Sequence, residues 1–594
     1  MKTPEREIIP RIVSELATVH GLLNCLIKEF ALPERCIAYE WPQDIQGMPP
    51  GGCLHGLNRQ GIPLTIHLPC GRQFFVLVDR RDRFGSQRYL SDLYFRQGRG
   101  IWSSPGFATL VEQILEGCQR MTGTRNEELS DQVLRSRQLM ASILSHHMGS
   151  QRKIPLTDYL DSEQGLWFGH PNHPAPKARL WPDHLGQEAF APEFRVCTPL
   201  YQFEVPLEGL KVKANGLSET EALAGVADQS GARPGHALIA MHPVQAQLFM
   251  QDARVQALLA QGVIADRGTT GFMAGPTASI RTWYVEGHDY FIKGSLNVRI
   301  TNCVRKNAWY ELESALLIDR LFRQIRRSRP DSLKEAAVVS EPAILSWSPT
   351  QAGKEDRRWF AEQTGIILRD NFCLRHGAEN CLLAGTLFAR DTLLQPLIQG
   401  FLESVCARQI DDEALLQWFD DYQRLLLNPV MSLFFNYGIV MEPHLQNTVL
   451  IHERGQPRQL LLRDFEGVKL TNDPGILLID EDIHPRVRQS LVYSRAQGWN
   501  RIVYCLFINN LSEAVLALSW DRPALATRMW QRVEQQLHRI RGELNGPAPE
   551  LDALIAGAPL ACKTNLKVRL AAQADRQAGY VQLSSPWCRE VAYA

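Results

Sequence analysis

The sequence predicts a mixed α+β fold, because stretches with helical periodicity are interspersed with short alternating or apolar runs that end at turn residues. Apolar side chains recur at helical spacing in residues 11–30, whereas Leu64, Ile66 and Leu68 alternate with polar neighbours. The length of 594 residues and the hydrophobic content of 45% allow a large buried core. Length alone suggests about three or four domains.

Charge and cysteine content exclude several classes of protein. The 64 Lys and Arg residues balance the 64 Asp and Glu residues, so no overall field favours nucleic acid or an anionic membrane. The N-terminus lacks the apolar core of a signal peptide, and no run approaches the roughly 20 apolar residues of a membrane span. The 13 cysteines are scattered without a CxxC pair, which argues against disulfides and structural zinc. We therefore expect a cytoplasmic protein that binds neither nucleic acid nor a membrane.

The N-terminal part is predicted to be helical with a small sheet. It contains no cluster of reactive side chains, so we expect it to serve packing. The predicted elements are a helix at 11–30, hairpin strands at 64–68 and 74–78, and helices at 107–121 and 129–148.

Two proline-containing loops carry histidines. The first, residues 163–179, includes His170, His173 and Lys177, and its prolines favour extended or turn geometry. The second opens a predicted helix at His242. For each of the three histidines, helix entry or loop hydrogen bonding is expected as often as a functional role.

The stretch from Gly275 to Asn307 is rich in side chains that bind phosphate and carboxylate groups. Residues 281–285 and 290–293 are predicted to be the two strands of a hairpin that turns at 286–289. An anion site is expected along this hairpin at Thr277, Ser279, Arg281, Thr282, Lys293, Arg299, Thr301 and Arg305.

The same residues leave an alternative open. Taken singly, Lys293, Arg299 and Arg305 are as often surface or ion-pair residues as ligands. Asn297, Arg299 and Thr301 alternate and therefore share one strand face. If that face is exposed to solvent, Thr301 does not bind a substrate.

The following stretch is expected to be structural. The predicted helix at 311–327 has an arginine-rich polar face, and such a charge run is usually a solvated face, so we assign it no function. Residues 328–354 are expected to be a connection, and a helical pattern at 415–426 leads toward Pro429.

A second polar group lies in the C-terminal part. Residues 438–451 are predicted to form strand, polar loop and strand, which places His444 and Asn447 in the loop and Asp464 at the end of the next strand. The order of Lys293, His444, Asn447 and Asp464 is similar to that of protein kinases, where it serves Mg-nucleotide chemistry. The glycine-rich loop, the HRD motif, a strict DFG motif and a Walker A lysine are all absent, so the order alone is a weak argument.

Six motifs occur in one order along the chain: GHPNHPAPKAR, MHPVQ, ASIRT, KGSLNVRITNCVRKN, EPHLQN and RDFEG. Together they resemble the aerobactin-synthetase family, the siderophore synthetases that work without a nonribosomal peptide template. The resemblance covers the chain from about residue 130 to the end. It is strongest to the citrate-using branch, and there to the achromobactin synthetases, which join citrate to L-serine.

The resemblance implies a cupped-hand architecture with a thumb, fingers and a kinase-like palm. We expect the thumb, helical with a small sheet, in residues 1–148, the fingers with the ATP-phosphate and carboxylate motifs in 149–395, and the palm in 396–594. It also implies ATP and Mg²⁺ as cofactors, citrate and an amino acid or amine as small-molecule substrates, and it allows a homodimer through the helices of the thumb.

The resemblance also implies roles for single residues. His444, Arg305 and Lys293 are expected to be catalytic, and Asp464, Glu466 and Asn447 to hold the metal. The expected ATP-binding residues are His170, Lys177, Ser279, Arg281, Thr282, Lys293, Gln446, Asn447 and Asp464. The expected citrate-binding residues are Thr301, Arg305, His444, Arg501, Tyr504 and Lys563.

The expected function is ATP-dependent adenylation of a citrate carboxylate, followed by condensation with a small nucleophile and release of AMP and pyrophosphate. The nucleophile is the L-serine hydroxyl, which gives an ester, or otherwise an amine, which gives an amide. Two alternatives are a kinase-like phosphotransferase or acyl-phosphate ligase that releases ADP, and a non-catalytic nucleotide- or siderophore-binding protein. The residues leave open which prochiral carboxylate reacts and whether His444 acts as a base or as a cationic stabiliser.

Overall fold

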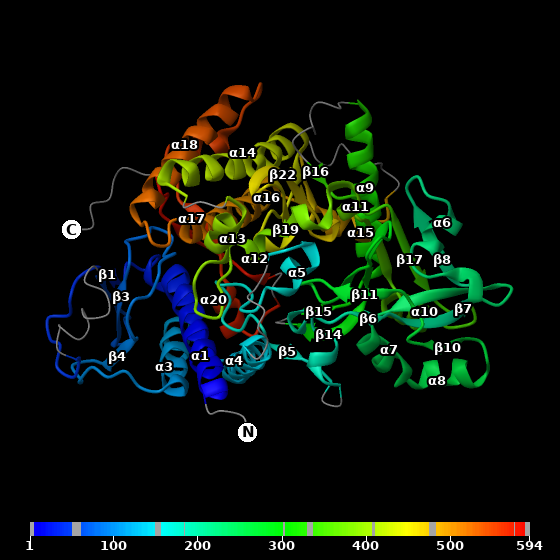
Figure 1. The fold of residues 1–594 in the computed structure, drawn as a ribbon, viewed down its shortest axis with the longest axis horizontal. Coiled ribbons are helices and arrows are strands. Elements are labelled where there is room, and N and C mark those ends of the chain that lie inside the picture. Colours follow the sequence, from blue (N-terminus) through cyan, green and yellow to red (C-terminus); the bar gives the residue numbers. More distant parts are fainter. Residues whose placement is uncertain are drawn as a thin grey trace.

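The structure, a computed structural model, describes residues 5–49, 61–148, 156–182, 185–300, 303–328, 337–406, 410–473, 483–574 and 577–587. Its helices and strands form the mixed α+β fold that the sequence predicts (Figure 1). In Figure 1 the N-terminal elements lie at one end of the long axis and the strands around β7 and β8 at the other. The C-terminal helices lie above and between them.

The N-terminal part combines long helices with a four-stranded antiparallel sheet, which confirms the predicted helices and hairpin. Leu22 and Phe30 of the first helix pack with Leu64, Phe74 and Val76 of the sheet in one core. The elements are α1 (Glu5–Leu26), the π-helix η1 (Ile27–Ala31), β1 (Ile37–Ala38), β2 (Ile62–His67), β3 (Arg72–Val78), β4 (Tyr94–Gln97), α3 (Phe107–Thr122) and α4 (Glu127–Met148).

The first turns of α1 differ from the prediction. Ile12 and Leu16 share the predicted apolar face, but they are 46% and 37% exposed. The reason is that this core takes up α1 only from Val19 onward, so the start of the helix extends past it.

The middle of the chain is built on a seven-stranded antiparallel sheet with the order β6-β11-β12-β13-β18-β17-β8. These strands are β6 (Thr198–Pro199), β8 (Leu210–Ala214), β11 (Met273–Pro276), β12 (Thr282–Tyr284), β13 (Tyr290–Gly294), β17 (Ala343–Trp347) and β18 (Ile366–Asp370). Two three-stranded sheets flank it: β10 (Ala265–Gly268), β7 (Tyr201–Pro206) and β9 (His236–Met241), and β15 (Cys303–Arg305), β14 (Leu296–Ile300) and β5 (Arg179–Leu180). The helices of this part are α5 (Tyr159–Gln164), α6 (Glu219–Ala224), α7 (Pro243–Met250), α8 (Ala253–Ala260), α9 (Trp309–Ser328) and α10 (Lys354–Gln363).

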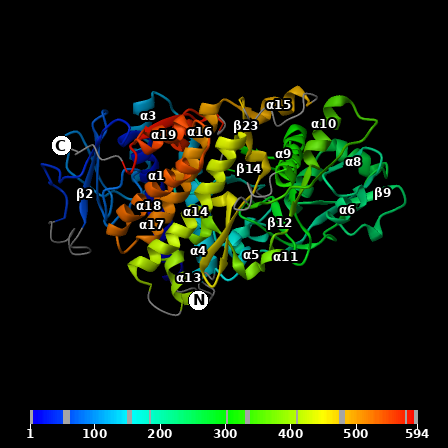
Figure 2. The ribbon, with the colours of Figure 1, turned by 90° about the horizontal axis from the view of Figure 1, so that it is seen from above.

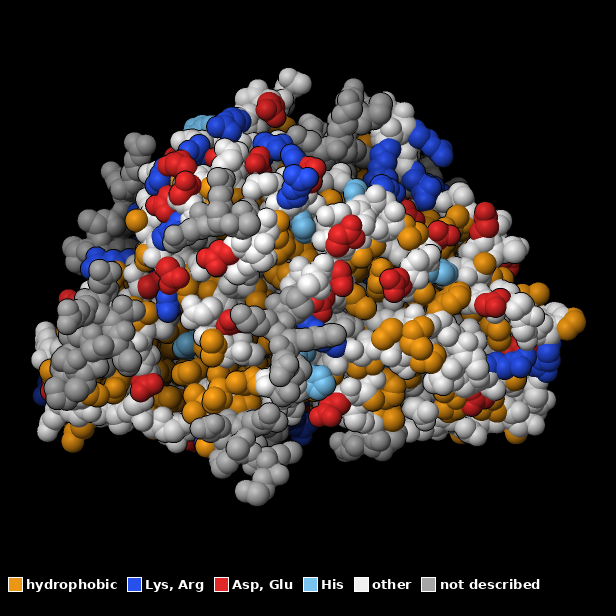
Figure 3. Space-filling model, in the orientation of Figure 1, with side chains coloured by type: hydrophobic (Ala, Val, Ile, Leu, Met, Phe, Trp, Pro, Cys, Tyr) orange, Lys and Arg blue, Asp and Glu red, His pale blue; other side chains and the backbone are white. Residues whose placement is uncertain are grey.

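The arginine-rich face of α9 is a solvated face, as predicted. Arg326 and Arg327 are exposed, and Arg323 pairs with Asp319 one turn before it at 2.7 Å. Figure 3 shows a group of Lys and Arg side chains at the place of α9 in Figure 1.

The prediction that residues 328–354 form a connection is wrong for their second half. Strands β16 (Ala337–Val338) and β17 lie there, and Ala343, Leu345 and Trp347 are buried. Proline, serine and charged residues dominate the composition of the whole stretch. The short apolar run from Ala343 to Trp347 was therefore not recognised as a strand.

The C-terminal part places three small sheets, of four, three and two strands, among helices. The hairpin of β21 (Thr448–Glu453) and β22 (Gln456–Leu462) confirms the predicted strands. The helical pattern at 415–426 lies in α14 (Asp412–Tyr437), which continues through Pro429. Helices α14 and α18 (Ala524–Glu543) lie side by side (Figure 2). The other elements are α11 (Cys373–His376), β19 (Cys381–Leu383), α12 (Ala384–Leu387), α13 (Leu397–Cys406), β20 (Ile439–Val440), β23 (Lys469–Thr471), α15 (Pro485–Leu491), β24 (Val492–Tyr493), α16 (Arg495–Val503), the π-helix η10 (Tyr504–Leu511), α17 (Ser512–Leu518), α19 (Pro549–Ile555), β25 (Leu560–Lys563), α20 (Asn565–Leu570) and β26 (Tyr580–Leu583).

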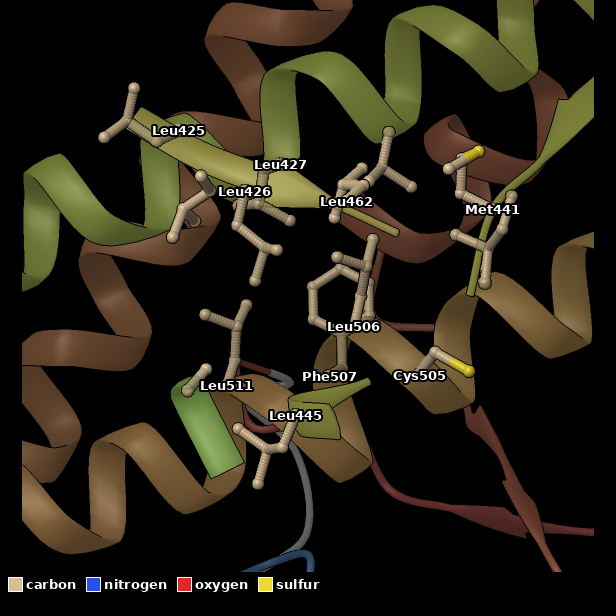
Figure 4. Packing of buried hydrophobic residues seen from close by; sticks show 14 of the residues in the cluster. Leu425, Leu426, Leu427, Met441, Leu445, Leu462, Cys505, Leu506, Phe507 and Leu511 are labelled. Atoms are coloured by element: carbon tan, nitrogen blue, oxygen red, sulfur yellow. The ribbon is translucent and has the colours of Figure 1, made fainter. Parts of the chain in front are cut away.

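One helical stretch meets the length and composition of a membrane span, contrary to the expectation that none does. It runs from Arg495 to Leu518 with a mean hydropathy of 1.4, and 94% of its apolar window is buried inside the structure. Figure 4 shows Leu506 and Phe507 from this stretch packed near Leu462 of β22 in the same apolar cluster. Burial of this extent is typical of a helix in a protein core.

Helix α20 near the C-terminus packs against the N-terminal part of the chain. Leu566 and Leu570 of α20 belong to the N-terminal core, and Glu29 accepts the N–H groups of Asn565, Leu566 and Lys567 at 2.8–3.0 Å. The C-terminal residues therefore complete the N-terminal core. The domain boundaries at residues 148 and 395 stay a prediction.

Candidate active site

The predicted hairpin at residues 281–293 is confirmed. Strands β12 and β13 pair with Thr282 opposite Lys293. The preceding loop is closed by the Thr277 N–H, which donates to the Thr282 carbonyl at 2.8 Å, and Ile280 has a φ of 69°. A β-branched residue in this left-handed conformation is strained, so the loop that presents Ser279 and Arg281 has a specific geometry.

Lys293 lies at the centre of a buried ion cluster. Its Nζ is 2.5 Å from Asp464 Oδ1 and 3.0 Å from Glu466 Oε2, and its side chain is 3% exposed. Arg281 donates to the same Glu466 oxygen at 2.6 Å. Lys293 and Asp464 are 171 residues apart in the sequence, so the cluster joins the central sheet to the segment after β22.

Opposite charges decide the protonation states in this cluster. Burial alone would raise the pKa values of Asp464 and Glu466, but the positive charges of Lys293 and Arg281 hold both low, that of Glu466 at about 2. Burial alone would lower the pKa values of Lys293 and Arg281, but the two acids raise both. All four groups are therefore charged at neutral pH.

Asp464 is held in a strained backbone conformation, with φ 80° and ψ 84°. Arg369 Nη2 lies 3.6 Å from its Oδ1 and donates to Glu341 at 2.6 Å, while Glu341 also accepts the Phe465 N–H at 3.2 Å. Strain that surrounding contacts maintain is common at functional sites.

The neighbouring Arg463 ties three segments together. Its guanidinium pairs with Glu163 of α5 and donates to the Gln446 carbonyl at 2.7 Å. Glu163 in turn accepts the Ala278 N–H, in the loop before β12, at 2.9 Å. Helix α5, the loop before β12 and the loop before β21 are thus fixed relative to one another.

His444 precedes the short 3-10 helix η7 (Leu445–Asn447). Within the part of the chain that the structure describes, its imidazole has no hydrogen-bond partner. Burial lowers the pKa of His444, and the charges of Arg501 and Lys563 act in the same direction, against those of Glu442 and Asp464. The ring is therefore mostly neutral at pH 7 and surrounded by charged groups.

His170 lies close to His444. Its Nδ1 accepts the Asn172 N–H at 3.0 Å, and its Nε2 lies 2.5 Å from Asn509 Nδ2. Burial lowers the pKa of His170 to about 3, and His173, His444 and Lys563 add to this effect. His170 is therefore a neutral group beside His444.

The structure does not bring Lys177 to these groups. Its ammonium donates to the Leu166 carbonyl at 2.5 Å and to Glu193 at 2.6 Å, and Arg179 pairs with the same carboxylate. Burial lowers its pKa. Lys177 thus lies in a separate buried ion cluster, and its contact with ATP stays a prediction.

Arg305 and Lys563 are cations without an ion-pair partner among the described residues. Arg305 ends β15 opposite Leu296, and Lys563 ends β25. Beyond the larger effect of burial, the charge of Lys563 lowers the pKa values of His170, His173 and His444, and that of Arg305 lowers the pKa of His173. Both cations therefore lie near these histidines.

Arg501, in contrast, is already paired. Its Nε donates to Glu442 at 2.5 Å and its Nη1 to the Tyr493 hydroxyl at 2.6 Å. The Tyr504 hydroxyl lies 3.5 Å from His170 Nε2 and accepts from the Asn565 amide at 3.1 Å. Arg501 thus lies near His444 and Tyr504 near His170, and their contact with citrate stays a prediction.

The face of β14 that precedes Thr301 is turned outward. Asn297 is exposed, and Arg299 pairs with Glu128 of α4 at 3.1 Å. Thr301 itself lies outside the described residues, so its predicted contact with citrate stays a prediction.

Ser279 and Asn447 contact residues next to the cluster, whereas His173 and His242 do not. The Ser279 hydroxyl accepts the Thr282 N–H at 3.2 Å, and the Asn447 carbonyl accepts the Arg463 N–H at 3.1 Å. His242 has a structural role, since its Nδ1 caps α7 by accepting the Val244 N–H at 3.0 Å.

Comparison with known proteins decides the family. A model of the IucA/IucC family matches residues 158–389, which include Lys293 and Arg305, and a model described as ferric iron reductase FhuF-like transporter matches residues 416–578. A spermidine-citrate ligase of Bacillus anthracis is 26% identical over 98% of both chains. The chain belongs to the IucA/IucC family.

Other relatives of this IucA/IucC family member agree. An L-2,3-diaminopropanoate–citrate ligase of Staphylococcus aureus is 24% identical over 86% of this chain and 89% of the relative. The ATP-bound aerobactin synthetase IucA of Klebsiella pneumoniae has the same fold, with a TM-score of 0.81 and 20% identity over 97% of this chain and all of the other. So does the petrobactin biosynthesis protein AsbB of Bacillus anthracis, with a TM-score of 0.74 and 17% identity over 97% and 95%. This IucA/IucC family member is an enzyme, a ligase of siderophore biosynthesis.

Several residues of the family member's site were not predicted from the sequence. Glu442 is part of the EPHLQN motif, yet only its ion pair with Arg501 reveals its place. Lys469 donates to the Glu466 carbonyl at 2.8 Å, and burial lowers its pKa to about 8. Nothing in the sequence marks Lys469, whereas the pair Asn509 and Asn510 after an apolar run is a visible signal.

Proposed function

We propose that this enzyme activates a carboxylate of citrate with ATP and joins it to a small nucleophile, with release of AMP and pyrophosphate. The observation that carries the proposal is the presence of two cationic groups. Lys293 and Arg281 form one, and Arg305 and Lys563, which have no partner in the described part of the chain, form the other. Two groups of cations suit two anions, a triphosphate and a polycarboxylate.

We assign the first group to the phosphates of ATP, with Ser279 and Thr282 beside it. We also assign His170, which lies near His444 and Lys563, to contact with the phosphates. In the free protein Asp464 and Glu466 neutralise Lys293 and Arg281. Phosphates would take over these cations and leave the two carboxylates to a divalent cation.

Asp464 and Glu466, with the amide of Asn447, fit Mg²⁺. Both acids are ionised because their pKa values are held low, against the effect of burial, by the neighbouring cations. The described residues contain no cluster of three or more His, Cys, Asp or Glu side chains that would form a complete metal site. Mg²⁺ typically uses one or two carboxylates together with substrate phosphates, and when bound it neutralises phosphate charge.

We assign Arg305, Lys563 and His444 to citrate. Activation brings a carboxylate oxygen against the α-phosphorus of ATP, two negative groups that repel each other, and pyrophosphate leaves as the new bond forms. Fixed cations at the point of contact reduce this repulsion. The acceptor then attacks the acyl carbon of the adenylate, AMP leaves, and the neutral His444 imidazole takes the acceptor's proton.

For the acceptor we propose L-serine, joined through its hydroxyl as an ester. The ion pair of Glu442 and Arg501, 19% and 23% exposed, lies near His444 and offers opposite charges to the ammonium and carboxylate of an amino acid. The two named ligase relatives join citrate to amines, spermidine and L-2,3-diaminopropanoate. An amide-linked product is therefore the alternative outcome.

The proposal is tested by pyrophosphate release with ATP, Mg²⁺ and citrate against a panel of amino acids and diamines, with mass spectrometry of the product. Citrate-dependent pyrophosphate and AMP with a citryl-serine ester are expected. Formation of ADP without pyrophosphate would favour the acyl-phosphate alternative. Absence of citrate-dependent ATP consumption with the whole panel would contradict the proposal.

Arg305→Ala is expected to raise the apparent KM for citrate by about tenfold or more, since a charge-assisted bidentate contact is lost, while the KM for ATP changes little. Arg299→Ala is the matched control, because Arg299 lies on the adjacent strand and pairs with Glu128. Steady-state kinetics with either substrate varied measures both. An effect of Arg305→Ala confined to ATP would move Arg305 to the nucleotide site.

A further inference from the structure

The backbone on both sides of His444 is held by two consecutive asparagines. Asn510 Nδ2 donates to the Pro443 carbonyl at 2.9 Å, and Asn509 Oδ1 accepts the Leu445 N–H at 3.0 Å. The imidazole of His444 has no hydrogen bond of its own in the described part of the chain. Its position therefore depends on these backbone contacts.

The Asn510 amide is itself fixed. Its side chain is fully buried, its Oδ1 accepts the Tyr422 hydroxyl at 2.7 Å, and its Nδ2 also lies 3.3 Å from Thr448 Oγ1. Thr448 Oγ1 donates to the His444 carbonyl at 3.1 Å. Side chains thus hold three successive backbone groups, the Pro443 carbonyl, the His444 carbonyl and the Leu445 N–H.

Both asparagines belong to the π-helix η10, all of whose residues are buried. Its apolar members Leu506, Phe507 and Leu511 belong to the cluster shown in Figure 4, together with Leu445 next to His444. A π-helix is rare, and such segments occur often at functional sites. Here the apolar side chains anchor the helix while the two amides face the loop of His444.

We propose that Asn509 and Asn510 are positioning residues that hold the His444 imidazole where it receives the proton of the acceptor. This inference rests on the proposed function, because it gives the two amides a role through His444. A buried asparagine can also serve folding alone. The two roles differ in whether the effect of losing Asn510 depends on His444.

Asn510→Leu keeps the number and branching of the side-chain heavy atoms but leaves the Pro443 carbonyl without its donor. Turnover is expected to fall by about 10- to 100-fold with the KM for ATP within about threefold of wild type, since small misplacements of a catalytic group have effects of this size. In a His444→Ala background the same change is expected to reduce turnover by less than about twofold, because the group that Asn510 positions is already absent. Equal losses in both backgrounds would overturn the proposal.

Two further variants separate positioning from folding. Tyr422→Phe removes only the hydroxyl that donates to Asn510, and a smaller loss in the same direction is expected even if Asn510→Leu does not fold. Gln229→Leu is the matched control, because Gln229 donates to the carbonyls of Leu223, Ala227 and Leu238 in another part of the molecule. It is expected to lower the Tm without changing turnover. A Tyr422→Phe enzyme with wild-type turnover would contradict the role of Asn510.

A second measurement needs no substrate. The imidazole signal of His444 is identified in NMR spectra as the one that His444→Ala lacks, and its titration in the wild type is expected below the ordinary pKa of 6.5 because the ring is buried. In Asn510→Leu or Tyr422→Phe the midpoint is expected to move toward the ordinary value as the loop loosens, and in Gln229→Leu to stay. If the wild type releases no citrate-dependent pyrophosphate, the proposed function fails, and this titration still decides the positioning. An unchanged midpoint in both loop variants would overturn it.

Discussion

His444→Ala is expected to reduce citrate-dependent turnover by about two or more orders of magnitude, the usual effect of losing a positioned acid–base group. The ring lies near Glu442, Asp464, Arg501 and Lys563, and it has no hydrogen-bond partner among the described residues. The fold is expected to stay intact, because the ring makes no hydrogen bond there. Pyrophosphate release and circular dichroism measure the two expectations.

The pH dependence of kcat/KM gives a second view of His444. Burial lowers the pKa of this imidazole, so a base role predicts an acid limb with its midpoint below 6.5 that disappears in His444→Ala. His452→Ala is the control, since burial also lowers the pKa of His452, and its Nδ1 accepts the Gly455 N–H at the far end of β21, away from the candidate site. Wild-type rates in His444→Ala would remove this residue from the mechanism.

Lys293→Met is expected to abolish measurable ATP-dependent activity and to lower the free energy of unfolding by about 3–5 kcal/mol at neutral pH. The substitution keeps the length of the side chain but leaves Asp464 without its 2.5 Å partner and removes one of the cations beside Glu466. Asp464 then keeps only Arg369, at 3.6 Å, as a cation beside it, and this weakened pairing of a largely buried charge accounts for most of the loss. Urea unfolding and pyrophosphate release measure the two effects.

The loss of folding stability caused by Lys293→Met is expected to change with pH in a predictable direction. In the wild type the pKa values of Asp464 and Glu466 are lowered, against burial, by Lys293 and Arg281, so this contribution is present above the ordinary carboxyl pKa of about 4 and is lost as the pH falls toward about 2. The difference between variant and wild type should therefore be largest near neutral pH and shrink in acid.

Lys306→Met is the control for Lys293→Met. Lys306 pairs with Glu362 at 2.9 Å but is 39% exposed, and a pair of this kind contributes about 0–1 kcal/mol. Equal losses of stability in the two variants, or a loss for Lys293→Met that grows in acid, would contradict the buried-cluster interpretation.

Local sequence patterns were sufficient to predict most of the helices and strands. The hairpin with Thr282 opposite Lys293 and the helices α3 and α4 follow from apolar periodicity and turn residues, which depend on neighbours in the chain. The pattern was insufficient for β16 and β17, whose short apolar runs are diluted by proline, serine and charge. The helical pattern also did not predict the full length of α14, which continues through Pro429 and is mostly buried.

Motifs located many of the candidate site residues but not their partners. Lys177 and Lys293 are both lysines in family motifs, yet one pairs with Glu193 and the other with Asp464. Arg501 and Arg305 are both arginines expected near citrate, yet only Arg501 has an acid beside it in the described residues. These differences arise from long-range packing, which no local pattern records.

By itself the sequence determined the mixed α+β class, the hairpin of Lys293, the strand end of Asp464 and the kind of chemistry that their side chains allow. Only the tertiary structure decided that Asp464 closes on Lys293, that Glu442 neutralises Arg501, and that a π-helix holds the backbone around His444. The physical reason is that side-chain type and periodicity are properties of neighbouring residues. The charge state and freedom of a buried group, in contrast, are set by partners 59 to 171 residues away that only folding brings within hydrogen-bond distance.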